Sequence, residues 1–273
     1  MWNEYFLQIT YLIGVIYLFG LAEYLLYRIF TALTGRAGYI FHRITGVIGT
    51  PVHELSHALM CILFGHRITK ICLYSAKAEN GTLGYVTHTY RKNNLYHRVG
   101  NFFISVAPVV FCPLVVVLFM RLLLPDAFNA AFYHISDVVD ISELSILSPE
   151  FYKSFGRAVI GVIRAVFIDV DITSVKYLLF FILAIPISMH AKMSPQDFKS
   201  SLFGAFVLAL SILAVDGIVF YLIKPEYVSI ITGICAKAVI TVASLILTGM
   251  VVYLSVIAVS AVIRLILKVI GRI

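Results

Sequence analysis

The chain has 273 residues, of which 61% are hydrophobic and only 13% are charged, and its mean hydropathy is +0.97. A soluble domain carries about 25% charged residues, so this composition excludes a soluble globular protein and indicates an integral, multi-pass membrane protein of one domain, residues 1–273. The net charge of +7 comes without a long basic run, which favours basic loops at a membrane surface over nucleic-acid binding. The four cysteines show no paired spacing, so we expect neither disulfides nor a thiolate zinc site.

Apolar segments along the chain predict an all-α polytopic bundle of about six transmembrane helices. Residues 5–33 are long enough to cross the bilayer once, and a polar, glycine-rich connection leads to a second span at about residues 44–64. A third span is expected at residues 95–124 and a fourth at 175–189. The fifth follows the helix start at Ser194 and Pro195 and runs to residue 223, and the sixth is expected at 236–267.

Between the second and third spans, at about residues 68–90, the pattern changes to a small β-hairpin. Residues 68–74 and 82–88 are short β-type runs, and the Asn80-Gly81 pair between them is a strong turn signal. We expect the hairpin at the membrane surface or dipping beside the second span, where its edge could pair with an extended substrate by strand addition. A hairpin that only caps the bundle is the alternative.

A long mixed segment at about residues 125–173 carries seven acidic and three basic residues. Its 155–167 part is typical of an amphipathic helix in the interface, and we interpret the segment as an acidic external or interfacial loop. The positive-inside rule then places the hairpin and the basic C-terminal end in the cytoplasm and this loop outside. Arg36 and Arg43 lie on the wrong side of that simple arrangement.

The second span contains the pattern His53-Glu54-Leu55-Ser56-His57. Helix positions four residues apart lie on one face, so His53 and His57 can present two imidazoles to one metal ion. Glu54 projects beside them, where a carboxylate can take a proton from a metal-bound water. A charged group in lipid costs about 2–3 kcal/mol, which favours a functional metal site over a polar packing network or a degenerate, inactive site.

A hydrolytic zinc site needs a third protein ligand, and a carboxylate is the first candidate. Asp197 follows a proline-broken span, although Ser194 as N-cap and Pro195 as first helical residue also fit a carboxylate that only stabilises a helix N-terminus. Asp216 lies inside the fifth span, where an unpaired carboxylate is costly. His190 is a further alternative, as a ligand or as a partner of Asp197.

These features together resemble the site-2 protease family of intramembrane zinc metalloproteases. The resemblance rests on the His-Glu-x-x-His pattern in a membrane helix, the following hairpin, a third span with glycine and proline between Gly100 and Pro108, and a later Pro-x-Asp stretch. It covers roughly residues 40–220. Phe198 follows Asp197, where the family usually has glycine, and Asp216 precedes a glycine but has no nearby prolines.

The resemblance implies a zinc cofactor held by His53, His57 and Asp197, with Asp216 or His190 as the alternative third ligand and Glu54 as general base. The implied reaction is hydrolysis of a peptide bond in or near a transmembrane segment of a membrane-protein or peptide substrate. Asn101 shares a helix face with Ser105 and is a candidate contact for the substrate backbone or the oxyanion.

A zinc-binding membrane protein without proteolytic activity is the alternative: a transporter, a sensor or an inactive protease homologue. The expected location is the plasma membrane of a prokaryote, in contact with the lipid bilayer. The sequence leaves the oligomeric state open.

Overall fold

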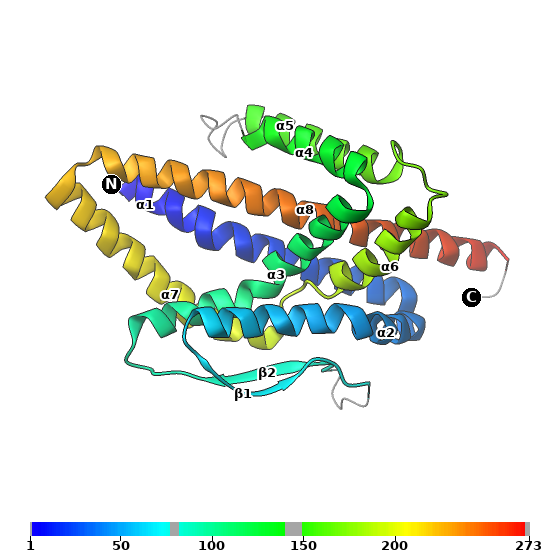
Figure 1. Ribbon diagram of the computed structural model, residues 1–273, viewed down its shortest axis with the longest axis horizontal. Coiled ribbons are helices and arrows are strands. Elements are labelled where there is room, and N and C mark those ends of the chain that lie inside the picture. The colour runs from blue at the N-terminus through cyan, green and yellow to red at the C-terminus, as the bar shows by residue number, and fades with distance from the viewer. Residues whose placement is uncertain (1, 77–81, 140–148, 271–273) are drawn as a thin grey trace.

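The computed structural model describes residues 2–76, 82–139 and 149–270, most of them helical (Figure 1). The mostly helical architecture with one small sheet agrees with the prediction. Along the chain the elements are α1 (Trp2–Ile9), the π-helical turn η1 (Thr10–Gly14), α2 (Val15–Leu63), β1 (Arg67–Cys72), β2 (Tyr85–Thr89), α3 (Leu95–Leu123), α4 (Pro125–Val139), α5 (Pro149–Phe167), α6 (Val175–Met189), α7 (Pro195–Ile218), the π-helical turn η3 (Val219–Ile223) and α8 (Glu226–Val269).

Gly35 divides the long helix α2 into two arms. Its φ of +56° lies in the left-handed region that favours glycine, and its ψ of −131° is not helical. The chain reverses here (Figure 1), and Tyr27 of the first arm packs against His42 of the second arm with 5.1 Å between the ring centroids. The predicted polar connection before residue 44 is therefore wrong, because residues 36–43 already form the helix of the second arm.

Four helical stretches of the described residues are long and apolar enough to cross a membrane. They are Trp2–Leu63, Leu95–Leu123, Pro195–Ile223 and Glu226–Val269, and the apolar α6 is shorter. The protein is therefore an integral membrane protein, while the count of six spans stays a prediction.

Helix α3 lies at the centre of the bundle, in contact with α2, α6, α7 and α8. Its Phe102, Val109 and Cys112 are fully buried. A helix that is apolar all round is expected at such a central position. The second arm of α2 packs against α3, so the two helices form a common wall for the motif histidines.

The hairpin lies along the second arm of α2. Strands β1 and β2 pair antiparallel, with Arg67 opposite Thr89 and Cys72 opposite Tyr85. The Tyr74 hydroxyl beyond β1 donates to the Arg43 carbonyl at 2.9 Å, near the start of the second arm. The predicted hairpin is confirmed, and it runs beside the motif helix; its expected turn at residues 79–81 lies outside the described residues.

The segment after α3 is a pair of helices and not a loop. Helices α4 and α5 pack against each other (Figure 1), and Val162, Ala165 and Val166 of α5 are buried. The amphipathic stretch at 155–167 is helical as predicted, because it forms most of α5. The interpretation of residues 125–173 as one long loop is wrong for its described part.

The chain between α6 and α7 is irregular, and α7 begins with a capping box. The Ser194 hydroxyl accepts from the Asp197 backbone N–H at 3.1 Å, and the Asp197 carboxylate accepts from the Ser194 N–H at 2.9 Å. Pro195 occupies the first helical turn. The predicted helix start is confirmed, and it fixes where Asp197 enters the bundle.

Candidate metal centre

Two imidazoles converge on one face of α2. His53 and His57 are one helical turn apart, and their Nε2 atoms lie 3.1 Å from each other. His57 is buried, and the side chain of His53 is only 14% exposed. Both rings therefore lie inside the protein with the same nitrogen turned toward the same point.

Two backbone carbonyls determine which nitrogen of each ring carries the proton. His53 Nδ1 lies 2.7 Å from the His190 carbonyl oxygen, and His57 Nδ1 lies 2.6 Å from that of Ile104. A carbonyl oxygen can only accept, so each Nδ1 carries the hydrogen and each neutral ring presents its Nε2 lone pair. Two lone pairs 3.1 Å apart repel each other, and a cation between them removes that repulsion. Histidine ligands of metals are commonly oriented in this way.

Asp197 places a carboxylate beside the two imidazoles. Its Oδ1 lies 3.5 Å from His57 Nε2, and its Oδ2 lies 3.9 Å from His53 Nε2. The ligand atoms of these three residues all lie within 4.8 Å of one another. Two imidazole nitrogens and one carboxylate fit zinc, and a three-ligand set leaves a coordination position open for water or substrate. The carboxylate also caps α7, so the helix-capping role expected from the sequence is present, and it leaves Asp197 beside both histidines.

The two alternative third ligands lie outside this cluster. Asp216 is buried near the other end of α7, where its carboxylate accepts from the Gln8 side chain at 3.2 Å. His190 contributes its carbonyl to His53, while its own ring Nδ1 donates to the Pro186 carbonyl at 2.8 Å. The structure thus gives both residues partners of their own.

Gly49 allows the end of α6 to approach the motif helix. A Cβ at this position would lie 2.2 Å from the Pro186 carbonyl oxygen and 2.5 Å from His190 Nδ1. Such distances are far below van der Waals contact, so a side chain at Gly49 would push α6 and the His190 carbonyl away from His53. Gly49 therefore serves as a packing surface for the end of α6.

A cavity of about 710 Å³ opens at the three donor residues. Glu54, which is 6% exposed, lines this cavity beside His53 and His57. Strand β2 and the residues just before it form another wall, and Gly84, which precedes the strand, comes so close that a Cβ there would lie 2.8 Å from Glu54 Cγ. A carboxylate, a potential metal site and a strand edge therefore share one space.

The wall from α3 differs from the sequence expectation. Ile104 and Ser105 line the cavity, and the Ser105 hydroxyl pairs with that of Ser200 at 2.9 Å. Asn101 is buried one turn earlier in α3 and is not among the lining residues. Ser200 and the Ile104 carbonyl were missed, because neither a serine in an apolar helix nor a backbone carbonyl has a distinctive sequence signal.

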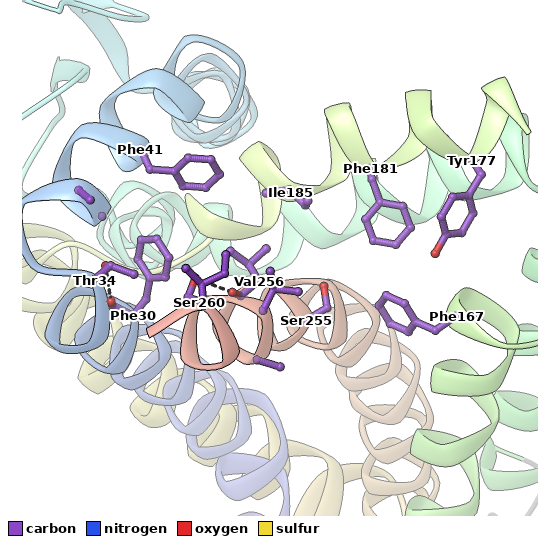
Figure 2. Close-up of a pocket in the computed structure, with 15 residues that line it drawn as sticks. Phe30, Thr34, Phe41, Phe167, Tyr177, Phe181, Ile185, Ser255, Val256 and Ser260 are labelled. Atoms are coloured by element: carbon purple, nitrogen blue, oxygen red, sulfur yellow. Dashed lines mark hydrogen bonds between the residues drawn. The ribbon is translucent and has the colours of Figure 1, made fainter. Parts of the chain in front are cut away.

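A second cavity, of about 760 Å³, lies between α2, the end of α5, α6 and α8 (Figure 2). Aromatic side chains such as Phe30, Phe167 and Phe181 surround it. Its described lining includes no carboxylate, imidazole or thiol. The side chains that could hold a metal or act as a base instead line the smaller, polar cavity at the motif.

The model of the Peptidase M50B-like family matches residues 24–170, which is more than half of the chain and includes the whole motif. The chain belongs to the Peptidase M50B-like family. No curated protein and no solved structure matches the chain. Membership of the M50B-like family points to a membrane metallopeptidase and agrees with the resemblance to site-2 proteases. Asp197 lies beyond the matched segment, so its candidacy as a ligand depends on the geometry and on the Pro-x-Asp stretch of the sequence.

Proposed function

We propose that this M50B-like protein is a zinc-dependent intramembrane endopeptidase that cuts a peptide bond in or near a transmembrane segment of a membrane protein. One observation carries the proposal: the Nε2 lone pairs of His53 and His57 and the Asp197 carboxylate converge in a cavity that also contains Glu54. A general base beside a three-donor metal cluster is the arrangement that peptide hydrolysis requires.

His53, His57 and Asp197 are the residues that would hold zinc. When bound, zinc lowers the pKa of a coordinated water and polarises the carbonyl of the scissile bond. The two backbone carbonyls that orient the histidines hold their Nε2 atoms in place before the metal arrives. Little reorganisation is then needed for metal binding.

Glu54 is the proposed general base. Its carboxylate accepts a proton from the attacking water and returns that proton to the amine that leaves when the peptide bond breaks. The cavity is large enough to hold water together with a short stretch of extended peptide. The position of Glu54 against β2 brings the base to the wall along which such a peptide would lie.

Strand β2 is the proposed docking edge for the substrate. It pairs with β1 on one side, and the described sheet has only these two strands. Residues 84–88 line the cavity. A transmembrane helix must unwind before hydrolysis, and an extended segment can then satisfy its backbone groups by adding a strand to this edge.

The proposal is tested by Glu54→Gln in the full-length protein, assayed on single-span membrane substrates. We expect cleavage to fall by at least about 10²-fold, with zinc content near stoichiometric because Glu54 is not among the three donors. Retained cleavage would contradict the role of Glu54. Stoichiometric zinc with no cleavage by the unaltered protein would instead favour a non-proteolytic transporter, a sensor or an inactive homologue.

A further inference from the structure

His88 lies on the face of β2 that is turned toward the motif helix. Side chains alternate between the two faces of a strand, and Gly84 abuts Glu54. His88, four residues further on, is therefore on the same face as Gly84 and lines the cavity. The hydroxyl of the neighbouring Thr87 pairs with that of Thr69 of β1, although Thr87 also contributes to the cavity lining.

A chain of hydrogen bonds fixes the proton on the His88 ring. His66 Nε2 lies 2.9 Å from the His97 carbonyl oxygen, so this nitrogen of His66 is the donor. The other nitrogen of the neutral ring, Nδ1, must then accept, and its partner is His88 Nδ1 at 3.0 Å. His88 therefore carries its hydrogen on Nδ1, and its Nε2 has a free lone pair.

The surroundings hold this arrangement in place. His66 is only 5% exposed, and its ring stacks on Tyr90 with 4.8 Å between centroids and an angle of 15° between the planes. Burial, followed by repulsion from His66 and His57, lowers the pKa of His88 to about 4. His88 is therefore neutral near pH 7, and its Nε2 is an acceptor.

We propose that His88 is a substrate-positioning residue whose Nε2 accepts a hydrogen bond from a backbone N–H of the unwound substrate segment. This inference rests on the proposed function. An extended segment in a buried cavity has backbone N–H groups that cost several kcal/mol each if they find no acceptor. His88 lies four residues from the contact of Gly84 with Glu54, about 13 Å along the strand. His88 is not among the three donor residues, so we expect it to act on the bound segment and not on the metal.

The position predicts an effect on binding and not on chemistry. An interaction made equally in the bound substrate and in the transition state changes KM and leaves kcat in place. His88→Phe keeps an aromatic ring against His66 but removes the acceptor, and we expect KM to rise about tenfold. His88→Gln can present an amide oxygen near the position of Nε2, and we expect it to retain most of the affinity.

The experiment uses the full chain in phosphatidylcholine vesicles with a panel of fluorescent single-span model peptides. Zinc content and thermal melting verify that each variant is folded. Thr241→Ala, at an exposed position of α8 outside the cavity lining, is the control and should leave KM unchanged. His66→Phe keeps the ring beside Tyr90 but takes the acceptor away from His88 Nδ1, so KM should rise here as well, by a smaller factor.

The outcomes separate the inference from the function on which it rests. An unchanged KM in a folded, active His88→Phe variant overturns the role of His88 and leaves the peptidase proposal intact. The role of His88 is also overturned if His88→Gln raises KM as much as His88→Phe, because altered packing would then explain both effects. If the unaltered, zinc-loaded protein cleaves no peptide of the panel, the proposed function fails, and the inference fails with it.

Discussion

The imidazole rings of His42 and His190 stack face to face, with 4.2 Å between their centroids and 3° between their planes. His42 belongs to the second arm of α2, and His190 ends α6. The His190 carbonyl in turn accepts the Nδ1–H of His53. The stack therefore links the reversal of α2 to the orientation of a candidate metal ligand.

His42→Ala should weaken zinc binding, although His42 is not one of the three donor residues. Loss of the stacked ring leaves the His190 backbone less constrained, and disturbance of a group that orients a metal-binding histidine commonly costs about 10- to 100-fold in affinity. His42→Phe keeps the aromatic face and should stay near the parent. Competition with a zinc chelator measures both variants, and equal affinities for alanine and parent would exclude this role.

Gly49→Ala should lower both the stability of the protein and its zinc affinity, although it adds only one methyl group. The added methyl group would meet the Pro186 carbonyl at 2.2 Å, so α6 must shift or the second arm of α2 must bend. Overpacking of this kind costs about 1–3 kcal/mol, and the displaced His190 carbonyl should lower zinc affinity as well. Gly217→Ala, where nothing lies within 4 Å of the added carbon, is the control. Thermal melting with and without chelator compares the two.

Asp197→Ala should lower the zinc content of the protein, whereas Asp216→Ala should not. The first removes a donor that lies with both histidines and should abolish stoichiometric zinc. The second removes the partner of Gln8, far along α7, and should leave zinc content unchanged while lowering stability. Elemental analysis of the purified variants decides the matter, and zinc retained in Asp197→Ala but lost in Asp216→Ala would reverse the assignment.

The hairpin should loosen as the pH falls. Burial lowers the pKa of His88 from 6.5 to about 4 in the folded protein, so between these values an opened hairpin binds a proton that the packed one does not. Stability of the packed form is therefore greatest above about pH 6.5 and declines toward about pH 4. Burial also lowers the pKa of His66, with the same sign. Amide exchange in β2, corrected for intrinsic rates, should show less protection at about pH 5 than at about pH 7.5, and the difference should shrink in His88→Gln.

Much of this architecture is predictable from local sequence. Long apolar runs predict the helices, since their length and lack of charge leave few alternatives. The spacing of His53 and His57 fixes a shared helix face, and Ser194, Pro195 and Asp197 identify the start of α7. Each of these predictions depends on residues a few positions apart.

Other features depend on contacts between distant segments and could not be predicted. Residues 36–43 have the glycine and arginine content of a connection, but packing of His42 on Tyr27 and His190 keeps them helical. The carbonyls of Ile104 and His190 orient the motif histidines, yet a backbone carbonyl is the same at every position in a sequence. The pairing of His66 with His88 requires the register of a hairpin whose partners are 22 residues apart.

The capping box at the start of α7 ties the third donor to a helix end. Asp197 accepts a hydrogen bond from the Ser194 N–H while facing both histidines, so its carboxylate moves with the first turn of α7. Ser194, Pro195 and Ser200 of the same turns also line the cavity. A displacement of this helix end that widens the cavity would therefore also move the Asp197 carboxylate away from His53 and His57. In the proposed peptidase, admission of the substrate and assembly of the metal site would then depend on the same movement of α7.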